Sequence, residues 1–241
     1  TCTKNIPFFV QVFIFATIGA ALFFHPDPDR DIAKLFRKFG AYIRSEEVRE
    51  LCRKRSSDFT RIYKFPWFDI LLYVIFRCKE CVSTELSNYY AGIGLSEKRV
   101  SRQAAFKALK KLNPQVFDPL IHKFVELFYK SPLVKTFRSY LLIAVDGTTL
   151  NFPAGRLSLQ RFGYIKNESI RTDADAKKAT SRSSALYDVT NGIILDFVMR
   201  RYKDSEIPIA IEQLGRIIQY LRGKAAIFLA DRYYDSVEVF S

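Results

Sequence analysis

The chain has 241 residues, of which 49% are hydrophobic and 26% are charged, and its formal net charge is +13. The apolar content is enough for one large core or two small ones, and four cysteines in this length exclude a disulfide-stapled scaffold and favour a reducing compartment. A positive charge of this size favours a polyanionic partner, either nucleic acid or an anionic membrane surface, without indicating any sequence specificity.

The first segment of the chain is strongly apolar. Ile6 to Phe24 contains no charged residue and has the length needed to span a bilayer. The alternative is a buried helix or strand pair of a soluble core, although Pro7 and Gly19 weaken one continuous soluble helix. We therefore treat residues 1–28 as a hydrophobic N-terminal segment, in which membrane attachment through residues 6–24 is an open alternative that is not favoured.

The next part of the chain, residues 29–138, is expected to be helical throughout. Apolar residues recur at helical spacing between breaker clusters that contain proline or glycine. Cys78 and Cys81 form a lone CxxC pair, which without further ligands is a weak zinc signal and favours helix-packing cysteines. The expected helices cover residues 32–39, 46–54, 67–76, 82–90, 101–112 and 116–129.

Two of these helices form a possible DNA-reading pair. Residues 82–90 and 101–112 flank a glycine-containing turn, and the second helix has one apolar stripe and a basic remainder. This pattern suggests a helix-turn-helix-like DNA reader, and an ordinary solvated helix face is an equally weighted alternative. The candidate DNA-binding residues here are Lys98, Arg99, Arg102, Lys107, Lys110 and Lys111.

The last part of the chain, residues 139–241, contains two apolar runs that each end in a carboxylate. Residues 141–145 run into Asp146 and Gly147, and residues 225–230 run into Asp231. Short apolar runs closed by a turn signal are typical of buried strands, and a strand that ends in a carboxylate commonly builds a metal or catalytic site. Taken alone, Asp146 and Gly147 could equally be the tip of a hairpin.

The intervening residues determine how these two strands are connected. Residues 184–190 and 193–199 are strand-like and flank Asn191-Gly192, a strong hairpin signal, and residues 207–221 have helical periodicity. A strand–helix–strand crossover makes the flanking strands parallel, so both aspartates can lie at neighbouring strand ends of one mixed sheet. The segment between residues 152 and 182 is polar and without clear periodicity, and its candidate phosphate-contacting residues are Arg156, Arg161, Lys177, Lys178 and Arg182.

The order and spacing of these motifs resemble the ribonuclease-H-like catalytic core of DDE transposases, in particular the insertion-sequence-four group. The matching residues are the stretch that ends in Asp146-Gly-Thr-Thr149, the hairpin of residues 184–196, Ser205-Glu206 and Ile227-Phe-Leu-Ala-Asp-Arg-Tyr-Tyr234. The resemblance implies an α/β (α+β) fold, in which an N-terminal all-helical domain precedes a ribonuclease-H-like mixed sheet with flanking helices, incomplete at the C-terminus.

The resemblance also implies a chemistry. Asp146 and Asp231 would be catalytic and metal-binding carboxylates, and a third, a glutamate, would lie beyond Ser241. Two Mg²⁺ or Mn²⁺ ions in the intact site would support DNA strand cleavage and strand transfer, with this chain alone inactive. The chain departs from the family pattern at Tyr233, where glycine is customary. Asp188 and Asp196 look like family features of the hairpin rather than metal ligands.

The expected partner is double-stranded DNA, as transposon ends and as target, bound by a homodimer in the cytoplasm. Two alternatives belong to other classes of protein. One is a DNA-binding protein with a vestigial catalytic domain. The departure from the family pattern at Tyr233 is consistent with this alternative. The other is a membrane-attached protein, which depends wholly on residues 6–24.

Overall fold

The fold is described by a computed structural model that covers residues 28–60, 65–77, 80–98, 100–166, 172, 176–221, 223–231 and 234. The apolar segment of residues 6–24 lies outside these described residues, and so do Cys78, Arg99 and Tyr233. No helix among the described residues combines the length and the apolar character that crossing a membrane requires.

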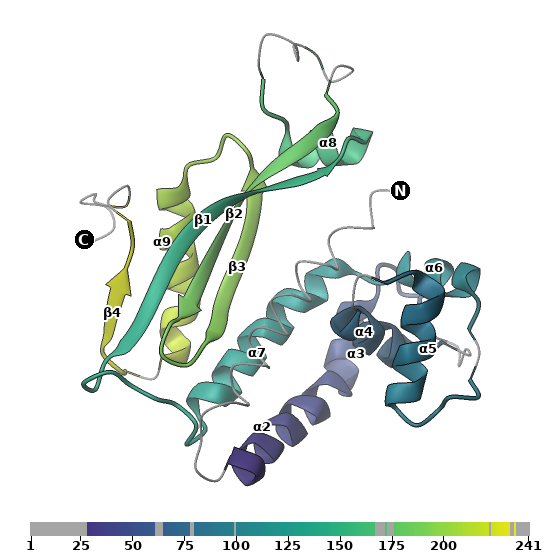
Figure 1. Cartoon of the computed structure of the whole chain (residues 1–241), viewed down its shortest axis with the longest axis horizontal. Coiled ribbons are helices and arrows are strands. Elements are labelled where there is room, and N and C mark those ends of the chain that lie inside the picture. Colours follow the sequence, from purple (N-terminus) through teal and green to yellow (C-terminus); the bar gives the residue numbers. More distant parts are fainter. Residues whose placement is uncertain are drawn as a thin grey trace.

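The N-terminal half of the described chain is helical, as the periodicity predicted (Figure 1). Side chains cap several of these helices at their first residues. The Ser45 hydroxyl accepts a hydrogen bond from the Val48 N–H, and the Ser101 hydroxyl accepts one from the Ala104 N–H. The elements are α2 (Pro28–Ile43), α3 (Glu46–Cys52), α4 (Trp67–Phe76), α5 (Val82–Gly92), α6 (Arg102–Leu109), η2 (Pro114–Val116) and α7 (Phe117–Tyr129).

The C-terminal half is a mixed sheet with the strand order β3-β2-β1-β4. The β1–β2 and β2–β3 pairs are antiparallel, and the β1–β4 pair is parallel, as the crossover predicted. The mixed α/β fold, with helices first and the sheet second, is consistent with the expected ribonuclease-H-like core. The elements are β1 (Leu141–Pro153), α8 (Arg156–Phe162), β2 (Lys178–Asp188), β3 (Ile193–Arg201), α9 (Glu206–Ile217), η3 (Ile218–Tyr220) and β4 (Ala226–Leu229).

Three strand predictions need correction. The first strand does not end at Asp146, because β1 continues to Pro153 and pairs with β2 along this whole length. The segment expected to be irregular accordingly contains the end of β1, the helix α8 and the start of β2. The strand before Asp231 was expected to be buried, but Ile227, Phe228 and Leu229 are 38–46% exposed, and β4 is one of the two edge strands of the described sheet.

The helix-turn-helix interpretation also differs from the structure. The connection between α5 and α6 consists of residues 93–101, whereas a helix-turn-helix has a turn of about three to four residues. Each of the two helices packs on α4. The apolar stripe of α6 is nevertheless where the periodicity placed it, with Ala105 buried and Leu109 packed against the core.

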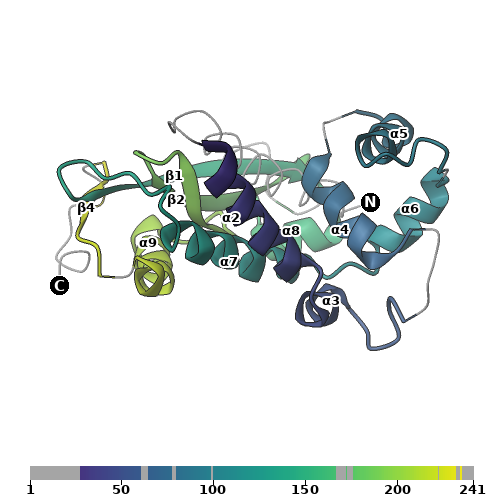
Figure 2. The same cartoon turned by 90° about the horizontal axis from the view of Figure 1, so that it is seen from below.

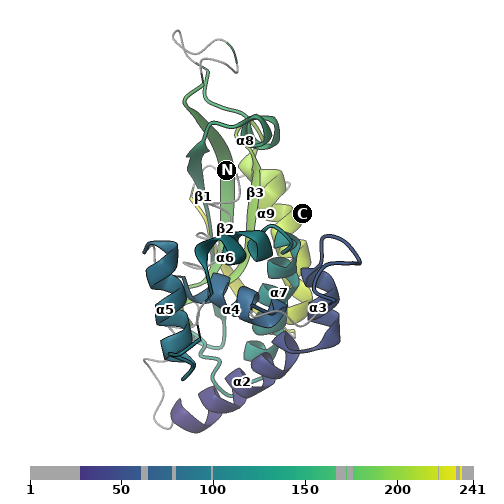
Figure 3. The same cartoon turned by 90° about the vertical axis from the view of Figure 1, so that its right-hand side faces the viewer.

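One hydrophobic core joins the helical half to the sheet. Its buried members include Phe124 and Val125 from α7 and Ile143, Leu186 and Leu195 from three strands. Helices α7 and α9 cover the same face of the sheet (Figures 2 and 3), with α7 packed on β3 and α9 on β2 and β3. The helical half is therefore part of the body that supports the strands.

Candidate active site

The parallel pair of strands brings Asp146 and Asp231 to the same level of the sheet. The last paired residues of β1 and β4 are Ala144 and Leu229. Asp146 follows two residues later within β1, and Asp231 follows two residues after the end of β4, so both aspartates lie beyond the same end of the parallel pair. Both residues are exposed to solvent.

A third carboxylate, Glu206, lies next to this pair. It is the first residue of α9, and its side chain is only 17% exposed. One of its oxygens accepts a 3.1 Å hydrogen bond from the Tyr234 hydroxyl, and the other pairs with the guanidinium of Arg182. The sequence analysis named Glu206 only as part of the Ser205-Glu206 match and gave it no role in the site, so its contact with Gly147 beside Asp146 was missed.

Gly147 makes room for the Glu206 carboxylate. A Cβ atom added at residue 147 would lie 2.5 Å from the carboxyl carbon and from one carboxyl oxygen of Glu206. With any other residue at position 147, the end of the Glu206 side chain would have to move from this place. The glycine that follows Asp146 is thus needed for close approach of a neighbouring carboxylate, and not for a hairpin tip.

Tyr234 lies among all three carboxylates. It is 3% exposed, and burial raises the pKa of its hydroxyl, with further increases from the negative charges of Glu206, Asp146 and Asp231. The hydroxyl therefore stays protonated and serves as a hydrogen-bond donor. The Tyr234 N–H also donates a 3.1 Å hydrogen bond to the Asp231 carbonyl, which ties this residue to the end of β4.

The donor chemistry of the site fits a hard cation. Asp146 and Asp231 offer exposed carboxylate oxygens, which Mg²⁺ prefers and commonly supplements with several water molecules. Within the part of the chain that the structure describes, no group of three or more His, Cys, Asp or Glu side chains could hold a metal ion. The described residues thus supply two carboxylates, which fit part of a metal shell.

The two other aspartates of the sheet have structural partners. The Asp188 carboxylate is fully buried and accepts hydrogen bonds of 2.7 Å from both the Tyr129 hydroxyl and the Asn191 side-chain amide. Such a satisfied buried carboxylate holds elements together, in keeping with the expectation that Asp188 is a feature of the hairpin.

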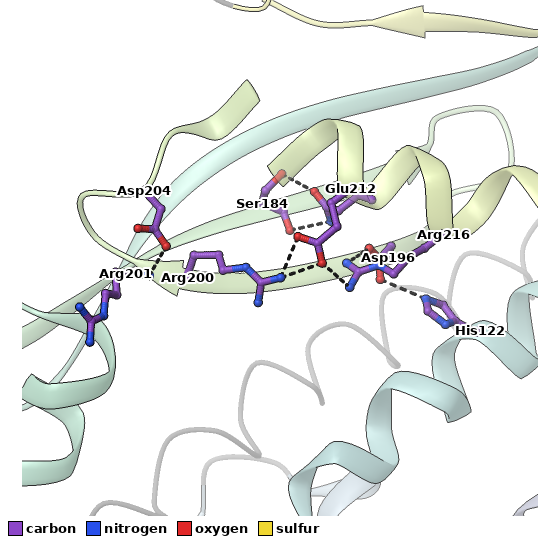
Figure 4. A network of polar contacts seen from close by, with 9 residues as sticks. His122, Ser184, Asp196, Arg200, Arg201, Asp204, Glu212 and Arg216 are labelled. Carbon is purple, nitrogen blue, oxygen red and sulfur yellow. Dashed lines mark hydrogen bonds and ion pairs between the residues drawn. The ribbon is translucent and has the colours of Figure 1, made fainter. Parts of the chain in front are cut away.

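Asp196 lies in a network between α7, β3 and α9 (Figure 4). It is 3.1 Å from His122 Nε2 and accepts a 2.5 Å hydrogen bond from Arg216, which also pairs with Glu212. Burial alone would raise the pKa of Asp196, but the hydrogen bonds and positive charge from His122 and Arg216 outweigh it and lower the pKa. Asp118 nearby is exposed at its surface, but desolvation by the surrounding protein and the negative charge of Asp196 raise its pKa.

Two of the candidate DNA-binding residues are engaged within the protein. The ammonium of Lys98 pairs with Asp69 at 2.9 Å and lies over the ring of Tyr90, and the guanidinium of Arg182 pairs with Glu206. Arg182 also belongs to β2 rather than to an irregular loop. Lys98 and Arg182 therefore have structural partners that the sequence did not reveal.

The candidate residues of α6 line or flank a groove of about 1060 Å³. Arg102, Lys107 and Lys110 are exposed, and Lys111 is half-buried. The groove is lined by both basic and apolar side chains. Its lining residues include Lys54, Arg55, Phe59, Phe65, Lys107, Lys110 and Lys111.

The remaining candidates gather at another place, where α8 packs on the start of β2. Arg156 and Arg161 on α8 are exposed, as are Lys177 and Lys178 beside the last residue of β1. Along the longest axis of the molecule, β4 and α6 lie at opposite ends (Figures 1 and 2). A single ligand that reached Asp231 and α6 would have to extend along the whole molecule.

Comparison with known protein families finds a match for the C-terminal part of the chain. Residues 138–241 match the family model of the transposase DDE domain. The match covers the whole sheet, including Asp146, Glu206, Asp231 and Tyr234, and supports a transposase that acts on DNA. No curated protein and no solved structure matches the chain.

Proposed function

We propose that this chain is part of a DDE transposase of the insertion-sequence-four group. The proposed reaction in the intact enzyme is metal-dependent cleavage of DNA strands followed by strand transfer. The observation that supports the proposal most directly is the parallel pairing of β1 with β4, the two strands that lead to Asp146 and Asp231, inside the region that matches the transposase DDE domain. This pair lies at the solvent-exposed edge of the sheet, where a DNA strand can approach.

Asp146 and Asp231 would hold divalent cations, Mg²⁺ or Mn²⁺, in this site. When bound, two such ions stabilise the attacking and leaving oxygens of a phosphoryl transfer. As the resemblance implies, the intact site would take a third metal-binding carboxylate, a glutamate. The protein's own contribution is to hold its carboxylates in register on two hydrogen-bonded strands, so that little rearrangement is needed when the substrate arrives.

Double-stranded DNA is the proposed partner, bound by residues outside the carboxylate edge. The groove along α6 and the basic group at α8 both offer side chains suited to phosphate contacts. We assign DNA binding to residues 29–138 and the chemistry to residues 139–241, with the apolar segment of residues 1–28 as a separate part. The protein would bind DNA in the cytoplasm as a homodimer, because two subunits suit the two ends of a transposon.

Metal binding tests this proposal directly. At a metal concentration about ten times the Kd, mass action adds about 1.4 kcal/mol of stability, which corresponds to a rise in Tm of about 3–5 °C. We expect that rise with Mg²⁺ or Mn²⁺ in the wild type and its loss in Asp146→Asn and in Asp231→Asn. Asp31→Asn on α2 removes the same charge from another element and should respond as the wild type does.

A wild type that shows no metal-dependent rise, or an equal rise in all variants, would remove the basis of the proposed site. DNA binding provides an independent readout, because the basic residues act without the metal. Retention of DNA by the protein in metal-free buffer is therefore expected.

A further inference from the structure

The Glu206 carboxylate contacts the neighbours of both site aspartates. It lies against Gly147, the residue that follows Asp146 in β1. It also accepts the hydrogen bond of the Tyr234 hydroxyl, while the Tyr234 backbone N–H is bonded to the Asp231 carbonyl. One side chain at the start of α9 thus connects the β1 side of the site to the β4 side.

This connection matters because β4 is held weakly. It has only four residues, and among the strands that the structure describes it lies at an edge of the sheet and pairs only with β1. Asp231 follows two residues after Leu229, the last residue of that strand. The hydrogen bonds of Tyr234 to the Asp231 carbonyl and to the Glu206 carboxylate therefore connect the end of β4 to α9.

Arg182 fixes the other side of Glu206. Its guanidinium pairs with the second carboxyl oxygen of Glu206 and lies 5.6 Å from the centre of the Tyr202 ring. Arg182 itself is held on β2 opposite Thr149, close to Gly147 along β1. The positive charge of Arg182 offsets the negative charge of Glu206. The Glu206 carboxylate can therefore lie near the two aspartates as a structural support and not as a further metal ligand.

We propose that Glu206 is a positioning residue that holds Asp231 opposite Asp146 through Tyr234. The inference rests on the proposed function, because it assigns Glu206 a role in the same metal-binding pair. It differs from that function in placing Glu206 outside the set of metal ligands. The geometry also explains why residue 147 is glycine, since a side chain there would displace the carboxylate.

The positioning role of Glu206 can be tested by measuring the Mn²⁺ affinity of the full chain by electron paramagnetic resonance. Loss of a residue that orients a metal ligand typically weakens metal affinity about 10–100-fold, so we expect at least about 10-fold weakening in Glu206→Ala and in Tyr234→Phe. Because both act through one hydrogen bond, the double variant should be no weaker than either single variant. Glu206→Gln keeps the shape and an acceptor for Tyr234, and should bind Mn²⁺ more tightly than Glu206→Ala does.

Glu212→Gln is the matched control, since Glu212 lies on the same helix and pairs with Arg200 and Arg216. It should bind Mn²⁺ as the wild type does. Wild-type affinity in both Glu206→Ala and Tyr234→Phe, alongside loss of binding in Asp146→Asn, would overturn the positioning role and leave the proposed function standing. Strictly additive losses in the double variant would also overturn it.

A second measurement does not depend on metal. Exchange of the Tyr234 backbone amide reports the turn that ends β4, because this N–H is bonded to Asp231. Glu206→Ala and Tyr234→Phe should each accelerate this exchange about 10-fold in metal-free buffer, and Glu212→Gln should not. If neither variant changed the rate of exchange, the positioning role of Glu206 would be overturned, whether or not the wild type binds Mn²⁺. Failure of the wild type to bind Mn²⁺ would instead defeat the proposed function.

Discussion

The Tyr129 hydroxyl on α7 donates a 2.7 Å hydrogen bond to the Asp188 carboxylate at the end of β2, and both groups are buried. This bond joins the helical half of the chain to the sheet. In Tyr129→Phe the buried carboxylate loses one of its donors, and we expect a loss of about 1.5–3 kcal/mol in the free energy of unfolding, measured by urea denaturation.

Tyr42→Phe is the control for this substitution. The Tyr42 hydroxyl donates to Glu47 at 3.2 Å on an exposed surface, so its loss should change the free energy of unfolding by less than about 1 kcal/mol. Equal effects of the two substitutions would show that the buried bond contributes nothing beyond an exposed one.

The network around Asp196 predicts a dependence of stability on pH. His122 and Arg216 hold the pKa of Asp196 below that of an unfolded aspartate, so its contribution is present above the unfolded pKa of about 3.9. The contribution is lost as the pH falls through the folded pKa. The difference in unfolding free energy between pH 7 and acid should therefore be smaller in Asp196→Asn than in the wild type.

Asp118 acts in the opposite direction, because its raised pKa favours the folded state as the pH falls. Thermal unfolding of Asp196→Asn and Asp118→Asn across this range should shift the pH profile in opposite senses. If the melting temperature depended on pH in the same way in both variants and in the wild type, folding would not change the pKa of either carboxylate.

The basic residues of α6 provide a test of DNA binding. Replacing Lys107, Lys110 and Lys111 with alanine should weaken binding to duplex DNA and flatten the plot of log affinity against log salt by about one unit per lost phosphate contact. A triple alanine variant of Lys34, Arg37 and Lys38 on α2 removes the same charge and should lose less. If both triple variants lost the same DNA affinity, the loss would be explained by the lower net charge and not by contacts of these three lysines.

The described cysteines should differ in reactivity. Burial raises the pKa of the Cys52 thiol to about 12, whereas hydrogen bonding with Thr84 lowers the pKa of the exposed Cys81 thiol. Since the thiolate is the nucleophile, iodoacetamide should alkylate Cys81 in the folded protein and leave Cys52 unmodified. Peptide mapping by mass spectrometry, before and after unfolding, distinguishes the two; early modification of Cys52 would contradict its burial.

The parts of the fold that the sequence predicted are those set by local periodicity. The helix predicted over residues 67–76 has those bounds in the structure, because Pro66 stands just before its first turn and Arg77 leaves the helix in an extended conformation. The hairpin at Asn191-Gly192 follows from a similarly local signal. The parallel pairing of β1 with β4 followed from one further rule, that a crossover makes strands parallel.

What the sequence did not reveal depends on partners distant in the chain. The extension of β1 beyond Asp146 is determined by β2, which pairs with it as far as Pro153. The exposure of β4 follows from its place at the edge of the sheet. The roles of Glu206 and Arg182 arise from contacts between strands and a helix that their local sequence patterns do not specify.

The packing of α7 on β3 has a consequence for how such proteins can diversify. Recombination that joined the first 138 residues of one relative to the sheet of another would bring together two surfaces that had not been selected for each other. Phe124 and Val125 would then have to fit foreign neighbours among the strands, at a cost typical of disturbed cores. The helical half and the sheet should consequently be inherited together.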